Sequence, residues 1–176
     1  SGDAAIIFSS PATSGGLGRS GSAYLLNLTE AEESFVSLGA MGVFANEGSK
    51  VVYTRQDDLS TLRLKELGSG KERVIGSGSP IAANPKGDKV LVATGGWNGI
   101  DVPLQVIDLT TGRTLDLGLG HAAAFVSNDD VLYYRGTAWN AFVFNHRASE
   151  SKPVAAPSGV KEPATVSKMD GSALVL

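Results

Sequence analysis

The chain passes from a turn directly into a short strand at Asp88-Lys-Val-Leu-Val92, where branched aliphatic residues follow a Gly-Asp pair. The same order of turn and strand recurs at intervals of about forty residues. The other copies are Asp3-Ala-Ala-Ile-Ile-Phe8, Ser49-Lys-Val-Val-Tyr53, Asp129-Asp-Val-Leu-Tyr133 and Ser172-Ala-Leu-Val-Leu176. A period of this length with several strands in each copy is typical of β-propeller blades, because helical repeats would show apolar residues at helical spacing. The repeat therefore predicts an all-β chain.

Each copy has room for four short strands separated by turns rich in Gly, Asn and Asp. In the third copy the expected strands are residues 89–94, 104–109, 114–118 and 121–126. The expected repeats are residues 3–48, 49–87, 88–128 and 129–171, and residues 172–176 begin a fifth. We expect about four antiparallel four-stranded blades, forming part of a larger ring of roughly six to eight blades.

Three segments are harder to place in this scheme. Thr29-Glu-Ala-Glu-Glu33 is interpreted as the hairpin turn of the first blade, because it is too short for a stable helix. Ser167–Gly171 is expected to be a turn, and prolines 153, 157 and 163 are expected to confine nearby strands to edges or loops. Because no second strand follows Ser172–Leu176, we expect a second chain or copy to complete the propeller.

Composition limits the classes of function. The 176 residues carry a net charge of −3 with no basic stripe, so a nucleic-acid surface is not expected. No apolar run is long enough to span a membrane. Cysteine is absent, which excludes thiolate catalysis and fits several compartments; a periplasmic or secreted location is favoured over a cytoplasmic one.

The repeat also carries a family resemblance. Asn84-Pro-Lys-Gly-Asp-Lys-Val-Leu-Val92, followed by Leu104-Gln-Val-Ile-Asp-Leu-Thr-Thr-Gly112, resembles the blade of TolB-like and WD-repeat-like propellers. The pattern of that family is a Ser-Pro-Asp-Gly-Lys turn, a strand and a Leu-x-Val-x-Asp hairpin. The resemblance implies the propeller fold along nearly the whole chain. Its motif residues are turn and core residues, which the family shares among assembly proteins, peptidase-associated propellers and lyases.

A long glycine-rich loop separates the first two expected strands. Within it, Gly16-Leu-Gly-Arg-Ser-Gly21 matches the dinucleotide fingerprint, but that fingerprint needs a helix directly after it, and a strand is expected here. We therefore expect no cofactor, and we interpret Arg19 at the tip of this loop as a candidate contact to a partner.

Two further loops repeat an aromatic-amide pair. Trp97-Asn98 and Trp139-Asn140 follow the first strands of the third and fourth copies, where they could form a recognition patch on one rim. His121 begins a strand of innermost type. Neither it nor His146 has a carboxylate close by in the sequence, so no metal site is expected. The candidate partner-binding residues are Arg19, Trp97, Asn98, His121, Trp139 and Asn140.

No Gly-x-Ser-x-Gly elbow occurs, and the paired aspartates at Asp57-Asp58 and Asp129-Asp130 fit turns better than acid-base catalysis. We therefore expect a non-catalytic propeller scaffold that binds a protein or peptide through its blade-rim loops. The alternative is that the chain is part of the gating propeller of a prolyl-oligopeptidase-like serine peptidase, whose catalytic domain lies outside these residues.

Overall fold

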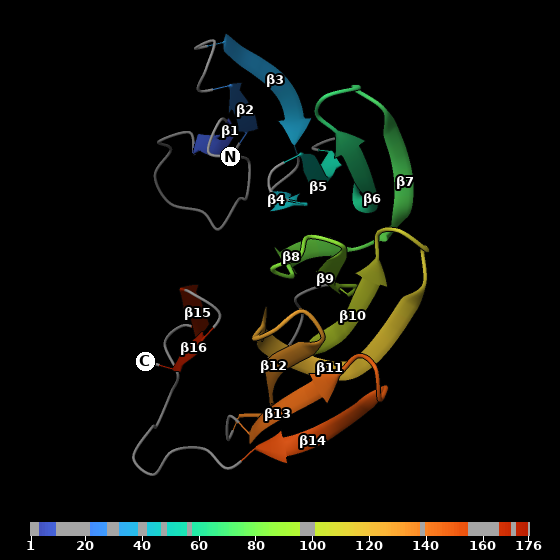
Figure 1. Ribbon diagram of the computed structural model, residues 1–176, viewed down its shortest axis with the longest axis vertical. Coiled ribbons are helices and arrows are strands. Elements are labelled where there is room, and N and C mark those ends of the chain that lie inside the picture. Colours follow the sequence, from blue (N-terminus) through green and yellow to red (C-terminus); the bar gives the residue numbers. More distant parts are fainter. Residues whose placement is uncertain are drawn as a thin grey trace. The chain divides into compact units, whose positions relative to one another are not determined.

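The computed structural model is built of short β-strands (Figure 1). It describes residues 4–9, 22–27, 32–38, 42–46, 49–55, 58–95, 101–137, 140–154, 166–169 and 172–175. The chain divides into two compact units, residues 1–80 and 81–176, and each is described by itself. Among the described residues, no helix is long and apolar enough to cross a membrane.

The first unit holds two antiparallel sheets. One has the order β1-β2-β3 and the other the order β4-β5-β6-β7. Their strands are β1 (Ala4–Ser9), β2 (Ser22–Asn27), β3 (Glu32–Leu38), β4 (Gly42–Ala45), β5 (Lys50–Arg55), β6 (Asp58–Glu66) and β7 (Glu72–Ser77). Burial falls from β5 to β7: Val52 and its cross-strand partner Leu64 are buried, whereas Val74 is exposed. The second of these sheets is thus a four-stranded blade with an exposed outer strand.

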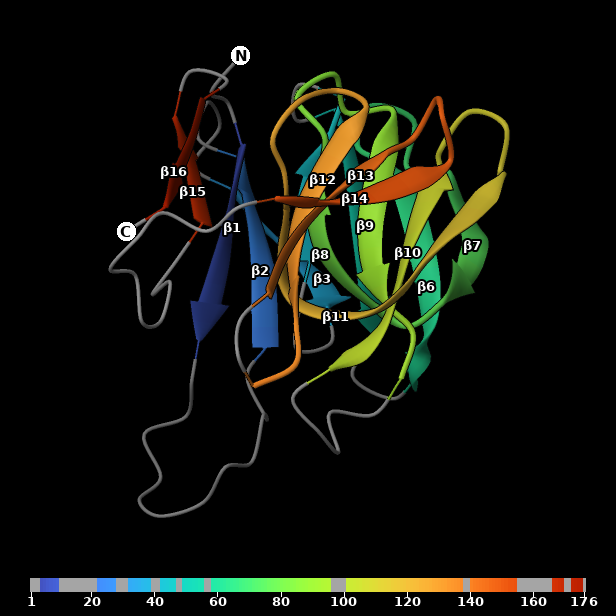
Figure 2. The ribbon, with the colours of Figure 1, turned by 90° about the horizontal axis from the view of Figure 1, so that it is seen from below.

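The second unit holds a seven-stranded sheet with the order β8-β9-β10-β11-β12-β13-β14 and a β15-β16 hairpin. Figure 2 shows β12, β13 and β14 lying next to one another in this sheet. The strands are β8 (Ser79–Ala83), β9 (Lys89–Ala93), β10 (Val102–Asp108), β11 (Thr114–Phe125), β12 (Asp130–Arg135), β13 (Asn140–Asn145), β14 (Glu150–Val154), β15 (Val166–Met169) and β16 (Ser172–Val175).

One strand, β11, serves two blades. Its residues 114–120 pair with β10, and its residues 121–125 pair with β12, with an irregularity in the register between His121 and Ala124. Seven strands therefore make two four-stranded blades, β8 to β11 and β11 to β14. The sequence suggested two separate strands at 114–118 and 121–126, and this separation is wrong. Gly118, with a φ of 80°, lies within the continuous strand in a backbone conformation that favours glycine.

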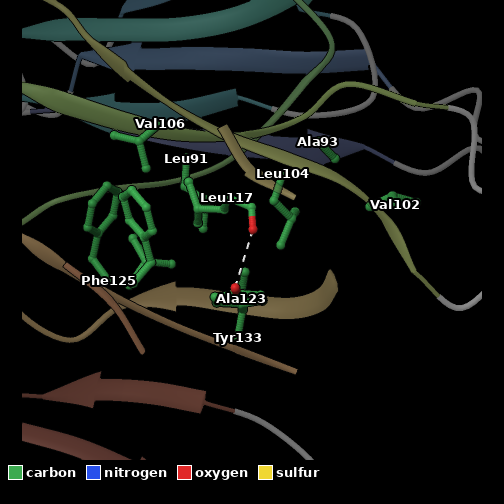
Figure 3. Packing of buried hydrophobic residues seen from close by; sticks show 11 residues of the cluster. Leu91, Ala93, Val102, Leu104, Val106, Leu117, Ala123, Phe125 and Tyr133 are labelled. Atoms are coloured by element: carbon green, nitrogen blue, oxygen red, sulfur yellow. Dashed lines mark hydrogen bonds between the residues drawn. The ribbon is translucent and has the colours of Figure 1, made fainter. Parts of the chain in front are cut away.

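The core of the second unit lies where these two blades pack together. Leu91, Leu104, Val106, Phe125 and Tyr133 belong to one buried cluster (Figure 3). Along β10, buried Val102 and Leu104 flank exposed Pro103, which is the alternation of a strand with one covered face. Burying one large aliphatic side chain contributes roughly 1.5–3 kcal/mol, so this cluster is the main source of stability for the unit.

A hydrogen-bonded latch joins the same two blades at the end where β9 and β12 begin. The Asn84 side-chain amide donates to the Asn128 carbonyl oxygen at 3.1 Å and to Asp88 Oδ1 at 2.8 Å. The Lys89 ammonium, with a side chain 9% exposed, lies 3.2 Å from Asp129 Oδ1 and 3.4 Å from Asp88 Oδ1. A nearly buried charge is thereby matched by two carboxylates, as burial requires.

Four expectations from the sequence can be compared with the strands of the structure. The expected hairpin turn at Thr29–Glu33 is too long, because Glu32 and Glu33 begin β3; its residues 29–31 lie outside the described residues. The expected turn at Ser167–Gly171 is too long, because β15 includes Ser167 to Met169. β16 pairs with β15, so one of its edges already has a partner within the chain. Pro153 lies in β14, the edge strand of its sheet, as expected.

Replacing Gly120 by alanine should destabilise the second unit. An added Cβ would lie 2.5 Å from Cδ2 of Tyr133, 2.9 Å from the Tyr134 carbonyl oxygen and 3.0 Å from Cδ1 of Leu104. Forcing a methyl group into such a packed position costs about 1–3 kcal/mol. Gly68→Ala is the matched control, because nothing lies within 4 Å of its added Cβ. Urea unfolding followed by circular dichroism measures both changes, and equal stability of the two variants would contradict the packing argument.

Asp88 should make the stability of the latch dependent on acid pH. Burial raises the pKa of Asp88, but hydrogen bonds from Lys86 and Asn84 and the charge of Lys89 outweigh it and lower the pKa from 3.8 to about 2. The ionised group therefore stabilises the fold above its ordinary pKa, and this contribution is lost as pH falls from 3.8 toward 2.

Asp88→Asn should accordingly lower the free energy of unfolding near neutral pH by roughly 1–2 kcal/mol. It should also flatten the pH dependence of that free energy in the same acid interval. Urea titrations at a series of pH values provide the measurement, with exposed Glu150→Gln as the control. A slope identical to that of the unsubstituted chain would show that Asp88 is not coupled to folding.

Candidate functional site

The two tryptophan loops begin and end at the same edge of neighbouring blades. One loop joins β9 to β10, and the other joins β12 to β13, which is the equivalent step of the next blade. Of the first loop, Thr94, Gly95 and Asp101 are described; of the second, Gly136 and Thr137. The chain crosses from one blade to the other at this edge, at Gly120 and His121 within β11.

A single carboxylate connects these three segments. Asp101 Oδ1 lies 2.6 Å from Nδ1 of His121, and the Gly136 backbone N–H donates to Oδ1 at 3.1 Å and to Oδ2 at 2.9 Å. An ionised carboxylate only accepts hydrogen bonds, so His121 Nδ1 carries the proton in this contact. Burial raises the pKa of Asp101, but the hydrogen bonds from His121 and Gly136 outweigh it and hold that pKa below its ordinary value.

The sequence analysis found no carboxylate close to His121 along the chain, but the structure brings the Asp101 carboxylate to it in space. Asp101 precedes His121 by twenty residues and lies directly before the neighbouring strand β10, so sequence spacing alone concealed the pair. His121 is 6% exposed, and its ring lies 6.3 Å from the ring of Tyr134. The histidine is therefore buried, and it is hydrogen-bonded to Asp101, the last residue of the loop that joins β9 to β10.

Arg135 is a further residue of this region, which the sequence analysis did not single out. Its Nε donates to the Leu119 carbonyl oxygen and its Nη2 to the Leu117 carbonyl oxygen, both at 3.0 Å. Its Nη2 also lies 2.7 Å from the Tyr133 hydroxyl, and the guanidinium lies 4.5 Å from the ring centre of Phe142. The guanidinium thus holds the end of β12 against the part of β11 that precedes the crossing.

A sequence signal for this arrangement existed in the repeated Tyr-x-Arg pattern. In the first unit, the Tyr53 hydroxyl donates to Glu72 Oε2 at 2.6 Å, and Arg55 pairs with Glu72 Oε1 at 3.0 Å. In the second unit, the Tyr133 hydroxyl donates to Ser151 Oγ at 2.9 Å. In both blades, therefore, the fourth residue of the second strand is a buried tyrosine whose hydroxyl donates to a polar side chain on the outer strand.

We call the described residues at this edge the Asp101 rim. Besides Asp101 and Gly136, it contains an exposed apolar pair, because Leu119 and Pro103 are cross-strand partners and Leu119 is 56% exposed. Gly95 lies against Pro103, since an added Cβ would be 2.9 Å from Pro103 Cδ. The members of the rim are Gly95, Asp101, Pro103, Leu119, Gly136 and Asn140.

The structure places two of the six candidate partner-binding residues. Asn140 is exposed at the start of β13, on the Asp101 rim, and His121 is buried beneath that rim. The other four, Arg19, Trp97, Asn98 and Trp139, lie outside the described residues. Trp97 and Trp139 are nevertheless four and three residues in sequence from Asp101 and Gly136, respectively.

The remaining polar clusters of the described residues serve the fold. Asp58 was expected in a turn but begins β6, where it accepts hydrogen bonds from Ser60 and Thr61 of the same strand, whereas Asp129 pairs with Lys89 and Arg147. Within the described ranges, no three His, Cys, Asp or Glu side chains are grouped closely enough to hold a metal ion. Open hollows of about 310 and 320 Å³ lie along the outer strands β14 and β7, and neither is lined by a residue of the Asp101 rim.

Solved structures provide the comparison for this arrangement. TolB from Acinetobacter baumannii matches with a TM-score of 0.62 and 16% identity, over 93% of this chain and 44% of that chain. The β-propeller domain of the Trilobed protease from Pyrococcus furiosus matches with a TM-score of 0.62 and 12% identity, over 86% and 52%. Acylaminoacyl peptidase from Pyrococcus horikoshii matches with a TM-score of 0.56 and 11% identity, over 76% and 27%.

No family model and no curated protein sequence matches the chain. The structural matches extend over about half of the TolB chain and of the protease propeller, or less, and at these identities they concern the fold alone. They confirm the expectation of a TolB-like β-propeller made of antiparallel four-stranded blades.

Proposed function

We propose that this chain is a non-catalytic propeller scaffold that binds a protein or peptide partner at the Asp101 rim. The loops that carry Trp97-Asn98 and Trp139-Asn140 supply the contacts, and the exposed pair of Pro103 and Leu119 adds apolar surface beside them. Arg19, in the glycine-rich loop of the first repeat, is a further contact in this proposal.

The observation that carries the proposal is the common anchoring of the two loops. Asp101 ends one loop and hydrogen-bonds the first residue of the other, so both emerge from one held edge. Tryptophan is enriched among the residues that dominate binding energy at protein interfaces. Two tryptophans in neighbouring loops, whose described ends are held by Asp101 and Arg135, suit the recognition of an extended peptide.

A random peptide library displayed on phage tests this proposal with a defined probe. Peptides selected on the intact chain should lose at least about tenfold in affinity for the Trp97→Ala/Trp139→Ala variant, since each interface tryptophan typically contributes more than 1 kcal/mol. Surface plasmon resonance with synthetic copies of the selected peptides measures the loss.

The control variant is Thr110→Ala/Arg113→Ala, which alters exposed residues of the turn at the opposite end of β10. It should bind the selected peptides as tightly as the unsubstituted chain does. Selected peptides that bind the tryptophan variant and the unsubstituted chain equally well would contradict the proposed site.

A second function is supported by the likeness to the peptidase structures. In this alternative the chain is part of a propeller that gates the active site of a prolyl-oligopeptidase-like serine peptidase. The two functions are distinguished by the gene that encodes the chain. A following α/β-hydrolase region with a Gly-x-Ser-x-Gly elbow favours the gating propeller, and a gene that encodes propeller blades without such a region favours the scaffold.

We further propose that a second chain or copy completes the propeller. Support comes from the partial extent of the matches, which cover 44% of TolB and 52% of the protease propeller. Native mass spectrometry of the 18.1 kDa chain should then show a dimer. Deleting residues 172–176 should lower the dimer fraction, and a monomer at all concentrations would contradict pairing between copies.

A further inference from the structure

Asp101 and Asp108 lie at opposite ends of β10, and their carboxylates accept hydrogen bonds from different parts of the chain. Asp108, at the other end of β10, accepts hydrogen bonds from the backbone N–H groups of Thr110 and Thr111, two and three residues away. Asp101 instead accepts from His121 and Gly136, twenty and thirty-five residues away. Asp108 shapes its own turn, whereas Asp101 connects two blades.

We propose that Asp101 is a positioning residue that holds the loops of both blades as a single unit. Asp101 directly precedes β10 of one blade, and its carboxylate contacts two residues of the next: His121 in the crossing strand lies on one oxygen, and the Gly136 N–H is shared by both oxygens. Because Gly136 is the first residue after β12, the position of Asp101 sets where the loop of the next blade starts.

The surroundings of the carboxylate suit this role. His121 is buried in β11 and paired in register with Tyr134, so the group that orients Asp101 is itself fixed by the sheet. Arg135, next to Gly136, is held by three hydrogen bonds to Leu117, Leu119 and Tyr133. Gly136 itself has a φ of 67°, so it takes the turn that directs the chain away from β12.

The two tryptophans of the chain make this inference measurable without a partner. Trp97 and Trp139 are the only tryptophans in the sequence, and each belongs to one of the two loops. In the Trp97→Phe background, all tryptophan emission comes from Trp139, which belongs to the blade that does not contain Asp101. Removing the Asp101 carboxylate should therefore change the signal of a residue in the neighbouring blade.

The experiment compares Asp101→Ala with Asp108→Ala, both in the Trp97→Phe background of the full chain. Asp101→Ala should raise the acrylamide quenching constant of Trp139 and shift its emission, whereas Asp108→Ala should leave both unchanged. Amide exchange at Gly136 should become roughly tenfold faster in Asp101→Ala, because that N–H loses a charge-assisted acceptor. Circular dichroism establishes that both variants are folded.

An unchanged Trp139 signal in folded Asp101→Ala would overturn the inference. If that variant does not fold, Asp101→Ser replaces it, since the shorter serine side chain removes the carboxylate that accepts from both His121 and Gly136. A folded Asp101→Ser variant with unchanged Trp139 quenching would overturn the inference equally.

The idea that the positioned loops bind a partner rests on the proposed function. The fluorescence test of Asp101 as a positioning residue does not depend on it. If Trp139 responds to Asp101→Ala while the selected peptides bind that variant as before, the loops are coupled and the peptide site lies elsewhere. If Trp139 does not respond and the tryptophan variant still loses peptide binding, the site stands without Asp101 as its positioning residue.

Discussion

The second unit depends on the backbone pairing of β11 with two partners. Thr114 to Gly120 form the outer strand of one blade, and His121 to Phe125 form the inner strand of the next. The crossing is possible because Gly120 has no side chain where Tyr133 and Leu104 pack. Burial of the core, the place of Arg135 and the contact between Asp101 and Gly136 all follow from this crossing.

Much of the fold was predictable, because the signals for it are local. A turn and the strand after it lie within ten residues, so the five repeated stretches could be recognised singly and coincide with β1, β5, β9, β12 and β16. The candidate site was harder to predict from the sequence than the fold. The contact between Asp101 and His121 depends on the register of β10 and β11, which sequence spacing does not express. Arg135 was recognisable only through the partial repeat of Tyr-x-Arg.

Shared architecture does not decide between the two functions considered. TolB, the Trilobed protease propeller and acylaminoacyl peptidase all match this chain in fold, and at the identities found the match reports packing rather than activity. In this chain the candidate binding residues belong to the blade edges, since Trp97-Asn98 lies close in sequence to Asp101 and Trp139-Asn140 lies close in sequence to Gly136. A propeller varies at these edges at little cost to its core, because the core residues lie on the strands and the edges lie between them.

The outer strand β14 has a consequence for how the chain behaves beside other copies. It is the last strand of the seven-stranded sheet, and Pro153 lies within it next to Lys152. A strand from another molecule that approached this edge would find no N–H at Pro153 and would have to desolvate a lysine ammonium. Lys152 and Pro153 therefore disfavour the pairing of a further strand from another molecule with β14. Fibrillar or edge-to-edge association is disfavoured there, even though the strand is exposed.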